Sequence, residues 1–288
     1  MLARGKRSTS KKLPQIEKKP QEIDNSRQEV PNVYLEGVTI GLGSRKVKSR
    51  IFLSISEAHS VTDELERIHF LPVIHVDKAS VDEAREIVHR VQPDVVAVEL
   101  DKQRYNQLME ENEELLDKET PNQMNVAEGF LNQIALLEKS LGQITGSGAG
   151  EEMKAAIEEG RKIGAKIALV DRPLGAIMNS LAEVPLDEIY RFASMVPDLE
   201  ELQSEEGEFD ILAFLKEEGT IPEMMEQFRS EFPSLAEVLI DERDEYVAEA
   251  LEFILKDVDG EIVAVLGAGH IDGVKEKLIE LLEKKAAA

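Results

Sequence analysis

Four short apolar runs, each followed by a polar or glycine-containing cluster, constrain the fold of this chain more than any other feature. Runs this short and this rich in Val and Ile are typical of strands buried on both faces of a parallel sheet. Open α/β sheets bind ligands outside the carboxyl ends of their strands, so we expect the four clusters to converge on one site. The runs and the residues after them are Ile68–Ile74 with His75, Val95–Val98 with Glu99, Ile167–Val170 with Asp171 and Arg172, and Ile262–Leu266 with Gly267 to His270.

The sequence between these runs predicts helices, which makes the fold class α/β. Ser80 and Glu83 match a capping box, and apolar residues recur after Ser80 at helical spacing, so a helix is expected between the first two runs. A strand, a helix and a second strand in this order form a parallel unit. We therefore predict a central, mainly parallel β-sheet of four core strands flanked by helices.

Two further segments belong to the same predicted domain, which covers residues 31–288. Residues 32–58 combine β-branched residues with Gly41 and Gly43 and predict a β-hairpin or a pair of edge strands. Residues 173–258 are acidic, are punctuated by prolines and contain no convincing strand, so they predict a large helical insertion before the last strand. This insertion is expected to form either a lid over the site or an interface with a partner, including a second copy in a homo-oligomer.

Charge separates the first 30 residues from the rest of the chain. Residues 1–30 contain eight Lys or Arg against four Asp or Glu and few large apolar residues, which predicts a disordered basic tail. The 288-residue chain carries a net charge of −24, which argues against nucleic acid as a partner. No apolar run is long enough for a membrane span, and the basic start lacks the apolar region of a secretory signal. With no cysteine in the chain, we expect a cytoplasmic protein.

His75, Glu99 and His270 are the strongest candidates for chemistry. Glu99 ends an apolar strand, where an unpaired carboxylate is costly; it is either a metal ligand or general base, or half of a structural ion pair. His270 follows a Gly267–Gly269 turn, at which glycines allow close approach to a ligand, unless it simply caps that turn. With His75 the set is His/His/carboxylate, which suits divalent Zn, Mn, Fe or Co.

Arginines provide the remaining candidate groups. Arg172 directly follows a predicted strand, Arg104 follows the second run, and Arg243 lies in an acidic stretch. Arginine suits carboxylates and phosphates, and each of the three could instead form an ordinary salt bridge. Position favours Arg172 for a role in the site.

Together these motifs resemble the TraB/PrgY (pheromone shutdown) family, which is related to the TIKI metalloproteases and to erythromycin-esterase-like and ChaN-like proteins. The family pattern has two Gly-x-x-His motifs. The second is intact at Gly267 to His270, whereas the first has Pro72 in place of Gly before His75. The resemblance runs from about Glu66 to Leu282 and includes His75–Val81, Pro93–Asp101 with Arg104–Tyr105, Gly164–Ala165 before Asp171–Arg172, Glu242–Asp244, and Gly267–His270.

The resemblance implies a metal-dependent, peptidase-like hydrolase that acts on short peptides or a related small substrate. His75 and His270 would ligate a divalent metal (Mn, Co or Zn), and Glu99 would ligate it or act as base toward a metal-bound water. Arg172 and Arg104 would hold a substrate carboxylate or the charge of the transition state. The C-terminal membrane helices of many members are not expected here. The alternatives are a non-enzymatic TraB-like protein that sequesters a peptide or small ligand, and a partner-docking scaffold.

Overall fold

The computed structural model describes residues 61–75, 77–109, 129–130, 150–195 and 211–286, with side chains from 213 in the last range, and the backbone of two short strands at 34–35 and 38–39. The predicted basic tail, residues 1–30, lies outside the described residues.

Among the described residues, six strands form one sheet in the order β2-β1-β5-β4-β6-β3. The four central runs pair in parallel, β3 with β6, β6 with β4, and β4 with β5, which confirms the predicted α/β fold with its parallel core. The strand pair predicted within 32–58 is confirmed for 34–35 and 38–39, since β1 pairs antiparallel with β2 and with β5. The other residues of 32–58 lie outside the described residues. The bounds are β1 Tyr34–Leu35, β2 Val38–Thr39, β3 Ile68–Val73, β4 Val95–Val98, β5 Lys166–Leu169 and β6 Ile262–Gly267.

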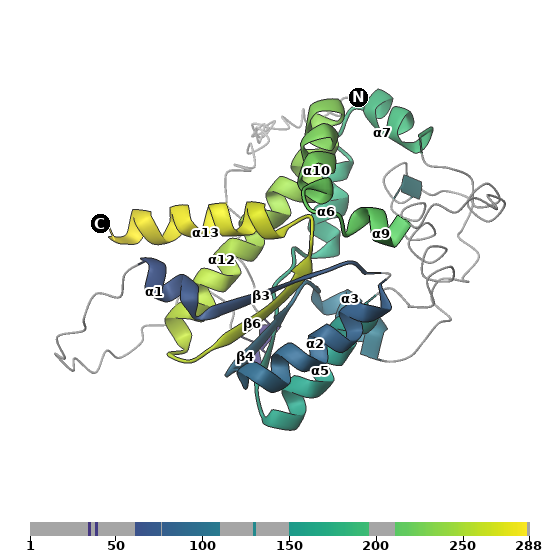
Figure 1. Cartoon of the computed structure of the whole chain (residues 1–288). Coiled ribbons are helices and arrows are strands. Elements are labelled where there is room, and N and C mark those ends of the chain that lie inside the picture. The colour runs from purple at the N-terminus through teal and green to yellow at the C-terminus, as the bar shows by residue number, and fades with distance from the viewer. Residues whose placement is uncertain are drawn as a thin grey trace, which may run out of the picture. The chain divides into compact units, whose positions relative to one another are not determined.

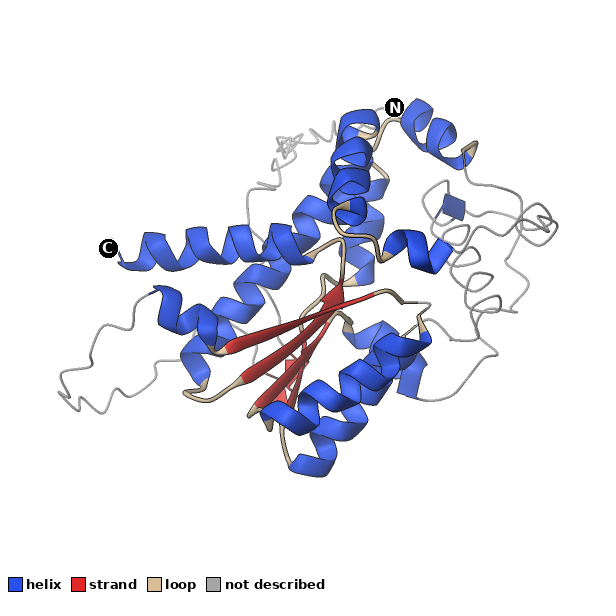
Figure 2. Ribbon diagram, in the orientation of Figure 1, coloured by secondary structure: helices blue, strands red, loops and turns tan. Residues whose placement is uncertain are grey.

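Helices cover both faces of this sheet (Figures 1 and 2). On one face lie α2 (Lys78–Val91) and α5 (Glu151–Ile163), with their apolar sides on β4, β5 and β6. The approach is close, because a Cβ at Gly160 of α5 would lie 2.8 Å from Cγ2 of Val96. The other face is covered by α12 (Glu242–Asp257) and α13 (Ile271–Ala286), with α1 (Val61–Glu66) beside α13.

The described part of the acidic segment 173–258 consists of helices joined by short turns and contains no strand. Its last helix, α12, is one of the layers that cover the sheet, so this part of the segment belongs to the core. An apolar cluster outside the sheet joins other helices of the segment through Phe192, whose ring contacts Phe130, Phe228 and Phe232 edge to face. The remaining helices are α3 Lys102–Met109, α6 Leu174–Leu181, α7 Leu186–Ala193, α9 Ile211–Leu215, α10 Thr220–Glu231 and α11 Pro233–Ala236, followed by the π-helix η2 Glu237–Asp241.

The start of α2 differs from the capping box predicted at Ser80, which was wrong. Asp77 is the N-cap, and its side chain accepts a hydrogen bond from the Ala79 N–H (3.0 Å). Ser80 is buried inside the first turn, where its hydroxyl accepts from the backbone N–H of Ile74 (3.4 Å). Asp and Ser are both favoured N-cap residues, and the earlier of the two starts the helix.

Pro72 lies in β3, the last strand of the sheet on this side among the described residues. The carbonyls of Arg67 and Val73 accept hydrogen bonds from the backbone N–H groups of Ile262 and Ala268. The backbone N–H and C=O groups of odd-numbered residues in β3 therefore face β6. Pro72 is even-numbered, so its backbone nitrogen faces away from β6, toward the outer edge of the sheet. The proline therefore removes no hydrogen bond from the ladder, as expected for proline in an edge strand.

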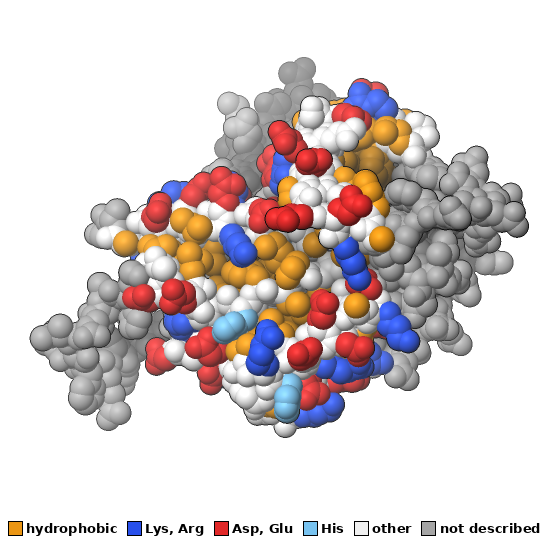
Figure 3. Space-filling model, in the orientation of Figure 1, with side chains coloured by type: hydrophobic (Ala, Val, Ile, Leu, Met, Phe, Trp, Pro, Cys, Tyr) orange, Lys and Arg blue, Asp and Glu red, His pale blue; other side chains and the backbone are white. Residues whose placement is uncertain are grey.

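Charged side chains of both signs are interspersed over the face shown in Figure 3. In the described ranges, no helix is both long enough and apolar enough to cross a bilayer.

Candidate functional site

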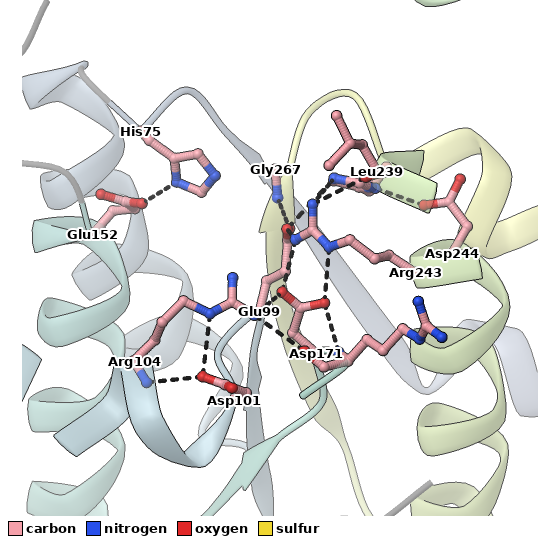
Figure 4. Close-up of polar contacts among 12 residues, drawn as sticks. His75, Glu99, Asp101, Arg104, Glu152, Asp171, Leu239, Arg243, Asp244 and Gly267 are labelled. Atoms are coloured by element: carbon pink, nitrogen blue, oxygen red, sulfur yellow. Dashed lines mark hydrogen bonds and ion pairs between the residues drawn. The ribbon is translucent and has the colours of Figure 1, made fainter. Parts of the chain in front are cut away.

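The carboxyl ends of the parallel strands bring His75, Glu99 and His270 together around Gly267. Figure 4 shows His75, Glu99 and Gly267 with their polar contacts. A Cβ on Gly267 would lie 3.2 Å from Oε2 of Glu99, 3.3 Å from Nε2 of His75 and 3.4 Å from Cδ2 of His270. The absence of a side chain at this position lets the two imidazoles and the carboxylate converge. The Gly267 N–H also donates to Oε2 of Glu99 (2.6 Å), which fixes the carboxylate over the turn.

Arg243, in the first turn of α12, is the hub of the site. Its Nε and Nη2 donate to the two oxygens of Asp171 (3.0 and 2.7 Å), and Nη2 also donates to Oε1 of Glu99. Its Nη1 donates to the Leu239 carbonyl in the π-helix (3.2 Å) and to Nε2 of His270 (3.0 Å). A guanidinium carries five N–H donors, so every donor of Arg243 is used inside the protein.

This ionic cluster stays charged although it is buried. Burial alone raises the pKa of Glu99 and of Asp171, but their neighbours outweigh burial and hold both pKa values below the usual range. For Glu99 the opposing groups are His270 and Arg243, and for Asp171 they are Arg243 and Arg104. Burial lowers the pKa of Arg243, and the same two carboxylates raise it above its ordinary value. The carboxylates are therefore ionised at neutral pH.

The contacts of His270 define its tautomer. Arginine only donates hydrogen bonds, so Nε2 of His270 accepts from Arg243. Nδ1 consequently carries the proton and donates it to Oδ1 of Asp244 (2.6 Å). The second oxygen of Asp244, Oδ2, is buried and accepts no hydrogen bond from the described residues. Burial is the main reason that the pKa of Asp244 is raised.

His75 is held in the same way on the other side of the site. Its Nδ1 lies 2.6 Å from Oε1 of Glu152, a fully buried residue in the first turn of α5. Oε2 of Glu152, like Oδ2 of Asp244, accepts no hydrogen bond within the described part of the chain. Each imidazole is thus bound at Nδ1 by a buried carboxylate, which leaves Nε2 on the side of Gly267 and Glu99.

The two arginines predicted for the site lie in different surroundings. Arg104 bridges two strand ends, since its Nε donates to Asp101 (3.2 Å) and its Nη2 to Asp171 (2.6 Å). Its Nη1 donates to no described residue. Arg172 instead turns toward α6 and α12, where its Nη1 donates to Ser180 (3.1 Å) and to Glu242. Arg104 therefore contacts Asp171 of the Glu99–Asp171–Arg243 cluster through its side chain, whereas Arg172 donates to Asp171 through its backbone N–H (2.7 Å).

Asp101 holds the helices on this side of the site in place. Its Oδ1 accepts from the backbone N–H of Arg104 (2.8 Å), which caps α3, and its Oδ2 accepts from the N–H of Leu174 (2.7 Å), the first residue of α6. One carboxylate therefore satisfies donors at two helix N-termini, which otherwise lack partners.

Sequence reasoning missed Glu152, Asp244 and the central role of Arg243. The stretch Glu242–Asp244 is part of the family resemblance, and that was the available signal for Arg243 and Asp244. Glu152 is one of two adjacent glutamates after a glycine-rich segment, and nothing in that pattern indicates a fully buried side chain.

His75, Glu99 and His270 are residue types that suit a divalent metal, but Arg243 occupies two of them. Metal-ligating histidines usually donate their other ring N–H to a carboxylate, as His75 and His270 are placed to do. However, Arg243 contacts both Glu99 and Nε2 of His270. Within the described residues no three His, Asp or Glu side chains form an arrangement that could hold a metal ion. Glu99 and His270 are therefore not both available while Arg243 keeps this position.

Comparison with known sequences assigns most of this chain to a family. The sequence model of the TraB/PrgY/gumN family matches residues 58–287. This chain belongs to that family. An uncharacterized protein of Methanocaldococcus jannaschii is 33% identical over 218 residues, which are 74% of this chain and 54% of the relative. The TraB domain-containing proteins of Bos taurus and Homo sapiens are 23% and 24% identical over 284 residues, 89% of this chain and 74% of each relative. The chain spans about half the length of the archaeal relative.

Proposed function

We propose that this TraB-family chain is a metal-dependent hydrolase that acts on short peptides or a related small substrate. The observation that carries the proposal is the convergence of His75, His270 and Glu99 on Gly267, with each imidazole backed by a buried carboxylate. Two histidines and a carboxylate are a common ligand set for divalent metals in hydrolytic enzymes.

In this proposal His75, Glu99 and His270 hold a Mn, Co or Zn ion. When bound, such an ion supplies a Lewis acid and a water of lowered pKa. The protein's own groups prepare the site. Glu152 and Asp244 keep the protons of the imidazoles on Nδ1, and the low pKa of Glu99 keeps its carboxylate ionised.

For the substrate we propose Arg104 over Arg172 as the group that binds a carboxylate. The Nη1 of Arg104 donates to no described residue, and the side chain remains part-exposed beside Asp171. Arg172 is already engaged by Glu242 and Ser180. A guanidinium nitrogen that donates to no described residue and lies near the strand ends suits the terminal carboxylate of a short peptide.

The test is the metal content of the purified full-length chain, with His270→Ala and His75→Ala as variants and His69→Ala as the matched control. His69 lies on β3 as well, but it is paired with Glu261 on the surface (2.7 Å). We expect near-stoichiometric metal in the wild type and the control, and loss in the other two variants. Absence of bound metal, together with no change in melting temperature on addition of Mn, Co or Zn, would contradict the proposal.

A second candidate, a binding protein that sequesters a peptide or small ligand, is favoured by Arg243. This residue keeps Glu99 and His270 engaged in internal hydrogen bonds, an arrangement suited to rigid recognition without chemistry. The two functions separate when a mixture of short peptides is incubated with the protein and followed by mass spectrometry. Hydrolysis that is lost in Glu99→Gln supports the enzyme, whereas retention of intact peptides by both forms supports sequestration.

A further inference from the structure

We propose that Arg243 is a positioning residue that controls metal binding, because its guanidinium stands as an internal cation between Glu99 and His270. The inference rests on the proposed function and adds to it a competition between one side chain and the metal ion. In this view the structure shows the closed form of the site, and a divalent ion enters by displacing Arg243 from two of its partners.

Nε2 of His270 makes the competition exclusive. An imidazole nitrogen has a single lone pair, and here it accepts a hydrogen bond from Nη1 of Arg243 (3.0 Å). The same lone pair would be needed to ligate a metal. Arg243 and a metal ion therefore cannot use His270 at the same time.

Glu99 adds an electrostatic reason. Its Oε1 accepts from Nη2 of Arg243, and its Oε2 already accepts from the Gly267 N–H (2.6 Å). A divalent ion at Glu99 would lie close to the guanidinium in a buried site, where like charges repel strongly. The Glu99 carboxylate therefore binds either the Arg243 guanidinium or the metal ion, and not both at once.

Asp171 can keep Arg243 paired after Arg243 leaves Glu99 and His270. Nε and Nη2 of Arg243 bind the two oxygens of Asp171 side by side (3.0 and 2.7 Å). This bidentate pair survives if Nη1 leaves His270 and Nη2 gives up its second contact, to Glu99. Release of the site thus needs a change in one side chain and leaves the buried Arg243–Asp171 pair intact.

The experiment is calorimetric titration of the full chain with Mn²⁺, Co²⁺ and Zn²⁺, each alone. Arg243→Gln removes the charge and is expected to bind metal roughly 10–100-fold more tightly than the wild type, the range by which groups around metal ligands alter affinity. His270→Ala combined with Arg243→Gln should abolish the gain. The matched control is Arg229→Gln, which removes a nearby cation that pairs with Asp241 (3.0 Å) and lies 3.9 Å from Oδ2 of Asp244, but contacts neither Glu99 nor His270.

A gain in Arg243→Gln that is absent in Arg229→Gln supports the inference. Equal affinity of the wild type and Arg243→Gln overturns it and leaves the proposed metal site standing. Absence of binding in every form overturns both. Should Arg243→Gln fail to fold, Arg243→Lys keeps the buried charge but cannot span Asp171, Glu99 and His270 with one ammonium. An affinity of Arg243→Lys above that of the wild type then supports the inference, and an unchanged affinity overturns it.

Discussion

The ionic cluster of Arg243, Glu99 and Asp171 and the two histidine–carboxylate pairs beside it meet at one edge of the sheet, yet they are satisfied to different degrees. In the cluster every donor of Arg243 has an acceptor, and both oxygens of each carboxylate accept hydrogen bonds. In the pairs, Glu152 and Asp244 each keep one buried oxygen that accepts no hydrogen bond within the described residues, although Oδ2 of Asp244 lies 3.9 Å from Nη2 of Arg229.

This difference indicates a structural role for the ionic cluster and a chemical role for the histidine–carboxylate pairs. A fully paired buried cluster is stable as a unit and costly to break at one member. A buried oxygen without a hydrogen bond costs stability, and such a cost is common at functional sites. The comparison therefore predicts the largest losses of stability when the cluster is broken, and smaller or opposite effects when a pair is altered.

The largest effect is expected for Asp171→Asn. The amide cannot replace a carboxylate between Arg104 and Arg243, and the variant should lose about 3–5 kcal/mol of unfolding free energy, as when a buried ion pair is broken. Urea denaturation at neutral pH measures this loss. Asp82→Asn is the control, because Asp82 pairs with Arg85 on the surface, and its loss should stay within about 1 kcal/mol. Similar losses in the two variants would remove the distinction.

Gly273→Ala should have the next largest effect, on the His270 side. A Cβ at Gly273 would lie 2.0 Å from Oδ2 of Asp244, so Asp244 must move away from His270. We expect a loss of about 1–3 kcal/mol, the usual cost of overpacking, measured by urea denaturation. Gly175→Ala in α6 is the matched control, since a Cβ there has nothing within 4 Å. Its stability should be unchanged or higher, and an equal loss at both positions would contradict the prediction.

A pH series compares the two aspartates directly. The pKa of Asp171 is lowered on folding, so its stabilisation is present above the unfolded pKa of about 3.9 and is lost as the pH falls through the folded value. The pKa of Asp244 is raised, so ionisation of this group reduces stability as the pH rises above about 3.9. Urea unfolding should show that the penalty of Asp171→Asn shrinks in acid, whereas Asp244→Asn becomes relatively more stable as the pH increases. Parallel pH curves for the two variants would be inconsistent with this assignment.

The smallest effect concerns the strand before His75. Pro72→Ala restores an N–H at the outer edge of β3, where no ladder bond is lost or gained, so the loss should be only about 0.4–1 kcal/mol from greater freedom of the unfolded chain. Thermal unfolding measures it. Leu71→Pro is the contrasting variant, because position 71 faces β6, and it should be much less stable. A large loss in Pro72→Ala would show that the proline shapes the His75 side of the site.

The sequence predicted the strands and the residues at their ends because both follow from local patterns. Apolar runs define buried strands, and parallel pairing places their carboxyl ends together, which is why His75, Glu99 and His270 meet. The partners of these residues come from helices far along the chain. Glu152 and Asp244 lie 77 and 26 residues from the histidines that they bind, and no local pattern encodes such a contact.

The arginines show the same limit. Arg172 follows a strand as predicted, but its side chain is attracted by Glu242, 70 residues away. Arg243 has an unremarkable place in a charged helix and becomes the hub only through the packing of α12 on the sheet. The predicted metal, substrate and compartment depend on contacts beyond this chain and stay predictions.

Pro72 has a consequence for association with other chains. An exposed edge strand offers a row of backbone donors and acceptors to which a strand of another molecule can add. At Pro72 the outward-facing donor is missing, so a strand docking along β3 would lose a hydrogen bond near the carboxyl end of β3. The residue that departs from the Gly-x-x-His pattern thus protects this side of the sheet against edge-to-edge aggregation.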